Sequence, residues 1–221
     1  MQRGVLCLVL SRQNRSNIGK RELMAITKLI GPSNALDVVS HAVTHLMSRG
    51  PRALSALGGA APKASQPVKL FVIGLDNIKD EHFLDSAVNV GWRYLVVNDG
   101  PVAVADVKVS PSGAAAFSSL IRGDIAVGLS EAADLASKKY GEYTDKYEPR
   151  ALDIPALYIS ALWLHGPRDA FFPFLAGGGI SRTVVREDPR FVKNVLLAAE
   201  TKRHPPRADD VSPPRGRQNQ P

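Results

Sequence analysis

Three residues whose side chains can act on a substrate lie close together in one short polar segment. His165, Arg168 and Asp169 follow one apolar run and precede another. A histidine with a carboxylate beside it can serve as a general base that the carboxylate orients. The segment also has the composition of a tight turn, and no Gly-x-Ser-x-Gly nucleophile motif occurs in the chain. A small hydrolase or transferase with its site at these residues is one hypothesis, and a structural turn is the other.

Two histidines one helical turn apart form a second candidate group. His41 and His45 are spaced i, i+4, and Asp37 precedes His41 by four residues. Such a pair on a helix can bind Zn²⁺, and a glutamate after the first histidine would complete the HExxH metalloprotease motif. Ala42 stands there instead, and about 12 Å of helix rise separates Asp37 from His45. We therefore expect a solvent-facing helix side, with no metal and no cofactor.

Two further sequence features are weaker candidates for a functional site. The run 177–183 is GGGISRT, whose successive backbone N–H groups can bind a phosphate. It matches neither GxGxxG nor GxxxxGK[ST], so a flexible connector is the favoured interpretation. The only cysteine, Cys7, lies in an apolar run, and we interpret it as a buried thiol without a catalytic partner.

The histidine pair belongs to a predicted helical hairpin over residues 17–49. Gly31-Pro32 ends its first helix, and apolar residues recur every three or four positions from Ala35 to Leu46 in its second. A helix-turn-helix for DNA would have this layout. The outward positions of the second helix offer almost no Arg, Lys, Asn or Gln for base edges, which disfavours that alternative.

Composition divides the chain into four parts. Residues 1–49 are a basic segment with the hairpin, and residues 50–67 are a linker rich in Gly, Pro and Ala. Residues 68–200 carry the strand and helix patterns of a core domain. Residues 201–221 are a basic, proline-rich tail that we expect to be disordered. Met1 and Met24 both stand as candidate start residues.

The core pattern predicts strands that pair with sequence neighbours. A buried strand begins at Val68, and two β-rich runs, 92–97 and 102–109, flank Asp99-Gly100 as a hairpin. Alternation in the second run places Asp106 and Lys108 toward solvent. Helices are expected near 80–90, 113–121, 130–140 and after Asp188-Pro189. We predict an α+β fold with a largely antiparallel sheet, flanking helices and no internal repeat.

The longest apolar stretch, Ile154–Leu175, indicates the centre of the core. It predicts two strands that meet at the polar turn, with almost no charge on either side. Its rings are expected to be mostly core, with at least one exposed in a groove as the alternative. These rings are Tyr158, Trp163, Phe171, Phe172 and Phe174.

Charge and hydrophobicity limit the function classes. The chain has 221 residues, is 44% hydrophobic and carries a formal net charge of +7. Residues 1–66 have nine cations and two acids, residues 67–200 have fourteen and seventeen, and residues 201–221 have five and two. Polar residues follow the short N-terminal apolar run where a cleavage site would lie, and no run approaches the ~20 residues that span a bilayer. We expect a cytoplasmic location without membrane binding.

The function hypotheses follow from these patterns. Because acids, histidines and hydroxyls are scattered, the leading hypothesis is a non-enzymatic protein–protein interaction or scaffold module. It would use the hairpin or a sheet edge to bind another protein or a second copy of the chain. The enzyme hypothesis at His165, Arg168 and Asp169 is the first alternative. Nucleic-acid binding through the basic termini is the second, and would weaken steeply with salt.

Overall fold

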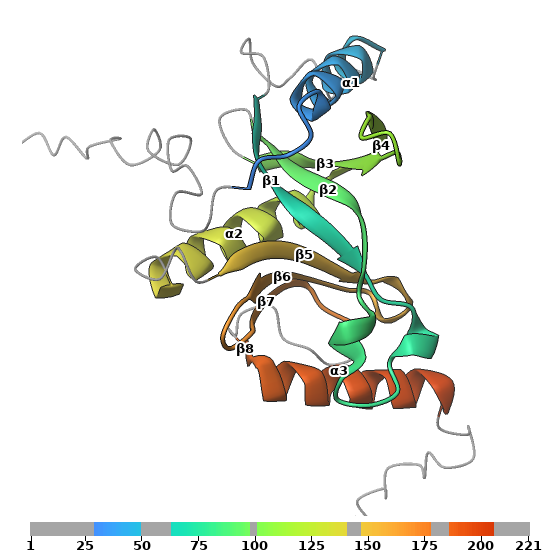
Figure 1. Ribbon diagram of the computed structural model, residues 1–221. Coiled ribbons are helices and arrows are strands. Elements are labelled where there is room, and N and C mark those ends of the chain that lie inside the picture. Colours follow the sequence, from blue (N-terminus) through green and yellow to red (C-terminus); the bar gives the residue numbers. More distant parts are fainter. Residues whose placement is uncertain (1–28, 50–62, 98–100, 141–146, 178–185, 206–221) are drawn as a thin grey trace, which may run out of the picture.

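The computed structural model describes residues 29–49, 63–97, 101–140, 147–177 and 186–205. Within these residues an eight-stranded mixed sheet is combined with three α-helices (Figure 1). The helices are α1 (Ala35–Arg49), α2 (Asp124–Tyr140) and α3 (Asp188–Arg203). The strands are β1 (Lys63–Val72), β2 (Val88–Val97), β3 (Pro101–Val109), β4 (Ala115–Arg122), β5 (Glu148–Ile154), β6 (Ile159–His165), β7 (Ala170–Leu175) and β8 (Arg186–Glu187). Three short 3-10 turns are η2 (Leu75–Asn77), η3 (Phe83–Ser86) and η5 (Pro155–Leu157).

The sheet consists of two antiparallel meanders joined side by side. Its strand order is β4-β3-β2-β1-β5-β6-β7-β8. The central pair, β1 and β5, is parallel, and the other neighbouring pairs are antiparallel. The α+β class and the largely antiparallel sheet are thus confirmed. Each meander is followed by a helix, α2 after β4 and α3 after β8, so the topology repeats although the sequence shows no repeat.

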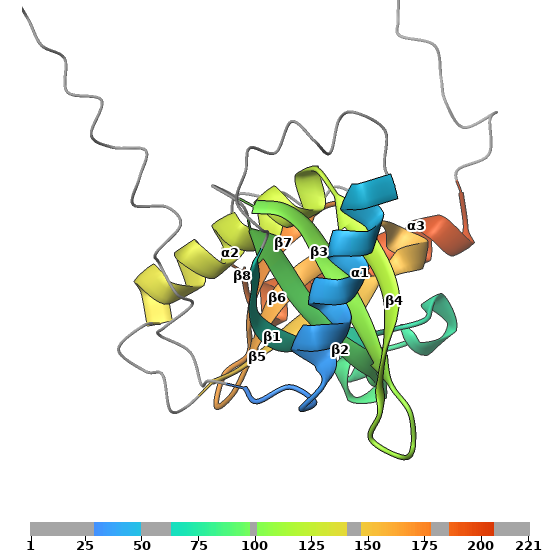
Figure 2. The same ribbon diagram turned by 90° about the horizontal axis from the view of Figure 1, so that it is seen from above.

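The helices cover the two faces of the sheet unequally. On the first face, the small side chains of α2 pack against β3 and β7 and so span both meanders. On the second face, α1 packs on β4, β1 and β3 and buries its apolar side against β2 and β3, and α3 packs on β7, β8 and η5. Figure 2 shows α1 lying over the meander of β2 to β4, while α3 lies at the opposite end of the molecule in Figure 1. No described helix is long and apolar enough to cross a membrane.

The predicted hairpin over 17–49 is shown only by its second helix. Residues 1–28, including Cys7 and the first predicted helix, lie outside the described residues. The apolar stripe of α1 is buried at Ala35, Val39 and Val43, where it packs against β2 and β3. A separate hydrophobic cluster therefore attaches α1 to the sheet. Residues 63–67 are part of β1 rather than linker, because they pair with the end of β2.

Two helices predicted in the core are wrong. Residues 115–122 form β4, because pairing with β3 outweighs the weak local preference of a short Ala- and Ser-rich run. The stretch 80–90 holds only the turn η3 before β2 begins. The helix predicted at 130–140 is present but begins six residues earlier, at Asp124. Ser130 is thus inside the helix and is not its cap.

The hydrophobic centre agrees with the sequence pattern. The stretch Ile154–Leu175 contains β6 and β7, and most of its rings are buried on one face or the other. Tyr158 is the exception: it is 69% exposed and has a positive φ of 54° in the turn before β6. The last helix begins at Asp188, and Phe191, Val195 and Ala199 bury its predicted apolar side.

Gly128 allows α2 to approach β7 closely. A Cβ atom at this position would lie 2.9 Å from the Cβ of Phe174 and 3.0 Å from its carbonyl oxygen. Both distances are shorter than ordinary contacts, and the carbonyl belongs to a paired strand that does not yield easily. The sequence pattern alone identifies Gly128 only as an unfavourable residue inside a helix.

We expect Gly128→Ala to lower the free energy of unfolding by about 1–3 kcal/mol, because overpacking outweighs the better helix propensity of alanine. Gly74→Ala is the matched control, since its Cβ would meet nothing closer than Asn77 Nδ2 at 3.9 Å. Urea unfolding of both variants measures the difference. A Gly128→Ala protein as stable as the parent would show that α2 can move away from β7 without loss.

Candidate functional site

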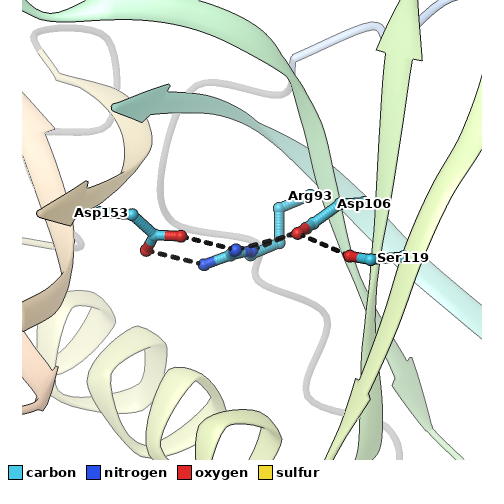
Figure 3. Close-up of polar contacts among 4 residues, drawn as sticks. All are labelled: Arg93, Asp106, Ser119 and Asp153. Carbon is cyan, nitrogen blue, oxygen red and sulfur yellow. Dashed lines mark hydrogen bonds and ion pairs between the residues drawn. The ribbon is translucent and has the colours of Figure 1, made fainter. Parts of the chain in front are cut away.

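A buried arginine lies between two carboxylates on the first face of the sheet (Figure 3). Arg93 Nε and Nη2 donate to Asp106 Oδ1 and Oδ2 at 2.8 and 3.0 Å. Its Nη1 and Nη2 donate to Asp153 Oδ1 and Oδ2 at 3.0 and 2.8 Å. Ser119 Oγ donates to Asp106 Oδ2 at 3.1 Å. Four hydrogen bonds to two carboxylates hold the guanidinium in one orientation.

Strand register explains why these residues meet. Arg93 on β2 is directly opposite Asp106 on β3, which is directly opposite Ser119 on β4. Asp153 lies on β5, beyond β1, so the arginine reaches across β1 to bond to it. The contact therefore connects the first meander to the second. Asp106 was predicted to face solvent, but it is 8% exposed because its part of the sheet face is covered.

The charges of this cluster stabilise one another. The side chain of Arg93 is 2% exposed, that of Asp106 11% and that of Asp153 20%. Burial by itself lowers the pKa of Arg93, but the hydrogen bonds and negative charges of Asp106 and Asp153 outweigh it and raise that pKa. The guanidinium is thus permanently charged. Most of its N–H groups donate to carboxylates within the protein, as expected for an arginine that stabilises the fold.

We expect Arg93→Met to lower the free energy of unfolding by about 3–5 kcal/mol, because Asp106 and Asp153 would lose their buried cation. Arg122→Met on β4, an exposed position, is the control and should change stability by less than about 0.5 kcal/mol. Adding Asp106→Leu and Asp153→Leu to Arg93→Met should recover part of the loss. Urea unfolding is followed by tryptophan fluorescence. An unchanged unfolding midpoint in Arg93→Met would contradict the structural role of Arg93.

A second cluster lies on the other face of the same central strands. Arg150 on β5 donates from Nε to Glu148 Oε1 at 2.8 Å, and Lys69 on β1 donates from Nζ to Glu148 Oε2 at 3.2 Å. The Arg150 guanidinium carbon is 4.7 Å from the ring centre of Phe71 and 4.7 Å from that of Trp163. The carboxylate of Glu148 thus pairs with both cations, and the rings of Phe71 and Trp163 contact the guanidinium of Arg150.

These groups belong to a stack that runs from α3 to the centre of the sheet. Phe191 of α3 stacks on Phe171 of β7 with ring centres 4.0 Å apart, and Phe171 stacks on Trp163 of β6 at 5.9 Å. Trp163 in turn contacts Arg150, and Arg150 contacts Phe71. Aromatic stacking and cation–π contact each stabilise such an arrangement. The position of Arg150 is therefore fixed by packing that begins in the core.

This part of the second face is partly exposed to solvent. Lys69 is 33% exposed, Glu148 28% and Arg150 17%. The register places Trp92 of β2 directly opposite Lys69. We call the surface of Lys69, Phe71, Trp92, Glu148 and Arg150 the central strip. It lies between α1, which packs mainly on β4, and α3, which packs on β7, β8 and η5.

One buried polar atom beside the central strip has no partner. Trp163 is 3% exposed, and its Nε1 has no hydrogen-bond acceptor among the described residues. A buried N–H that lacks an acceptor costs about 1–3 kcal/mol. The ring of Trp163 therefore contributes packing to Arg150 while its polar edge is unsatisfied.

Glu148 should make stability depend on pH. Burial by itself raises the pKa of Glu148, but hydrogen bonds and charges from Arg150 and Lys69 outweigh it and lower that pKa. Its stabilisation is present above the unfolded-state pKa of about 4.3 and is lost as the pH falls through the lower folded pKa. We expect the unfolding free energy of Glu148→Gln to fall less steeply than the parent's below about pH 4.3. Parallel curves in urea titrations would contradict this.

The structure brings two of the three predicted catalytic residues together. His165 Nδ1 and Asp169 Oδ1 are 3.1 Å apart in the turn between β6 and β7. Asp169 Oδ1 also accepts from the backbone N–H of Gly166 at 3.1 Å, which is turn chemistry. The His165 side chain is 45% exposed and its ring is 5.2 Å from that of Trp163. Arg168 is exposed.

The other predicted groups lie only partly within the described residues. His41 and His45 lie on the exposed side of α1 with ring centres 6.4 Å apart. No group of three metal-ligating side chains is found among the described residues. Residues 178–185 of the glycine run and residues 206–221 of the tail lie outside them.

Sequence reasoning missed both arginine clusters. Arg93 lies between Trp92 and Tyr94 in a β-rich run, and a charge inside such a run is a signal that a buried partner exists. The chain offers several carboxylates, and only the pairing of β1 with β5 selects Asp153. The sequence gives no signal for the enclosure of Arg150, because its two rings come from β1 and β6.

Comparison of the chain with protein-family models, with curated proteins and with solved structures gave no match. The functional conclusion therefore depends on the side chains that this fold brings together. Of the two arginine clusters, the first is closed by its own carboxylates and the second is partly open to solvent.

Proposed function

We propose that the protein is a non-enzymatic protein–protein interaction module and that its partner binds to the central strip. The observation that carries this proposal is the open strip itself, where rings and cations meet solvent on a rigid sheet. Arginine and aromatic side chains are the residues that most often dominate the binding energy of protein interfaces. Strands that pair on both sides present them without a large loss of conformational freedom.

The distribution of helices supports this location. Among the described residues, α1 packs mainly on β4 and α3 on β7, β8 and η5, so neither helix packs mainly on β5 in the centre of the second face. On the first face, the equivalent central position holds the closed cluster of Arg93. A partner that reaches the sheet thus meets accessible cations and rings on the second face.

The edge of the sheet is a less favourable surface. β4 is the outer strand of the first meander, but its pairing with β3 is irregular at Ser118. Asn34 Oδ1 accepts a hydrogen bond from the backbone N–H of Ala115 at 3.3 Å. Bulges and satisfied edge groups hinder the addition of another strand. We therefore place the partner on the central strip rather than on this edge.

The ionisable groups also favour binding over catalysis. The charged side chains that converge in the described structure are held in ion pairs: Arg93 with two aspartates, and Arg150 and Lys69 with Glu148. His165 and Asp169 are paired in an exposed turn. A catalytic histidine would need a nucleophile or substrate pocket beside it, and the turn hydrogen bonds already account for the position of Asp169.

Photocrosslinking tests the proposal. We expect p-benzoylphenylalanine at Trp92 of the full chain to capture one polypeptide in native lysate, because a docked partner covers this position. The control is the same group at Leu197, which is 66% exposed on α3. The captured protein is then purified, and Trp92→Ala and Lys69→Ala should weaken its binding at least about tenfold if they are central contacts. Equal capture from both positions, or none from position 92, contradicts the proposal.

A further inference from the structure

We infer that Arg150 is the anchor of the central strip and binds a carboxylate of the partner, an acidic side chain of a polypeptide. The inference rests on the proposed function, because it names the chemistry of the same surface. Phe71 and Trp163 each lie 4.7 Å from the Arg150 guanidinium carbon, on β1 and β6. These rings and the bond to Glu148 orient the guanidinium before a partner binds, so little conformational entropy is lost on binding.

The hydrogen-bond inventory of Arg150 leaves donors for a ligand. A guanidinium has five N–H donors in a planar fork. Arg150 uses Nε for Glu148 Oε1, and no other acceptor bonds to it among the described residues. The ring centres of Phe71 and Trp163 are 5.7 Å apart with planes 70° apart, so the two rings contact adjacent sides of the guanidinium. Nη1 and Nη2, in the plane of the fork, remain as donors for a ligand. A carboxylate approaches a guanidinium in that plane and accepts two parallel hydrogen bonds.

The local charge fits a single negative charge. Lys69 and Arg150 are two cations and Glu148 is one anion, so the ion-pair cluster carries a net charge of +1. One carboxylate neutralises this charge. A phosphate with nearly two negative charges would exceed it and be repelled by Glu148, which already lies between the cations. A carboxylate is therefore favoured over a phosphopeptide or a nucleic-acid backbone.

Trp163 provides a reporter of ligand binding at Arg150. Its Nε1 is buried without an acceptor in the described residues although its ring contacts Arg150. An indole N–H lies in the plane of its ring, so it cannot point toward the guanidinium stacked on the ring face. The chain contains only two tryptophans, so the indole signals of Trp92 and Trp163 are easily assigned.

The experiment is an NMR titration of the ¹⁵N-labelled full chain with a capped tetraglutamate peptide. Trp92→Phe assigns the two indole N–H signals. We expect saturable shifts of both signals with tetraglutamate and none with capped tetraglutamine. Arg150→Lys keeps the charge but loses the planar fork, and should weaken binding at least tenfold. Arg190→Gln, an exposed cation of α3, is the control and should bind as the parent does.

Glu148→Gln gives an independent arm that keeps Arg150 itself. It removes the internal carboxylate that competes for Lys69 and Arg150, so tetraglutamate should bind severalfold more tightly. Absence of a saturable shift, or equal binding by Arg150→Lys that retains a folded spectrum, overturns the inference. Tighter binding of a capped phosphoserine peptide than of tetraglutamate overturns it in favour of a phosphate site.

The two proposals fail in different ways. If the protein captured from position 92 binds Arg150→Lys as strongly as the parent, the anchor is wrong and the docking surface stands. If tetraglutamate binds through Arg150 but no polypeptide is captured from position 92, the interaction module is wrong. The inference is then also overturned, because the carboxylate would belong to a small molecule and not to a polypeptide.

Discussion

The guanidinium of Arg93 connects two meanders that pair through β1 and β5 and share the helix α2. It extends from β2 across β1 to Asp153, and Asp106 holds its other edge. A buried cation requires such partners, since its desolvation is costly when it is unpaired. The requirement determines which residues must be opposite one another on three strands. The strand register of the first meander and its contact with the second thus both depend on the side chain of Arg93.

This junction also determines where the helices lie. Each meander continues into a helix, and the parallel central pair places α2 on the first face and α3 on the second. α2 spans both meanders, and Gly128 lets its backbone approach β7. On the second face, α1 and α3 lie toward opposite ends (Figure 1). The strands between them keep a partly exposed surface, because neither of these two helices packs mainly there.

Two arginines on opposite faces of the central strands differ in how their charge is accommodated. Arg93 is closed by two carboxylates and is 2% exposed. Arg150 has one carboxylate, two rings on adjacent sides of its guanidinium and 17% exposure. Rings remove water from the faces of a guanidinium without using its N–H groups. The first arrangement therefore completes the fold, whereas the second leaves hydrogen-bonding capacity for a partner.

Local sequence patterns determined the elements whose neighbours are close in the chain. The hairpin of β2 and β3, the strands β6 and β7 around their polar turn, and the apolar side of α3 were all predictable, because turn residues and side-chain periodicity are local properties. β4 was predicted as a helix, since a short Ala- and Ser-rich run has little preference of its own and pairing with β3 decides its state. Tertiary structure alone selected Asp153 for Arg93, and Phe71 with Trp163 for Arg150. Those partners come from strands that lie far apart in sequence, and only the pairing of β1 with β5 and β5 with β6 brings them within contact distance.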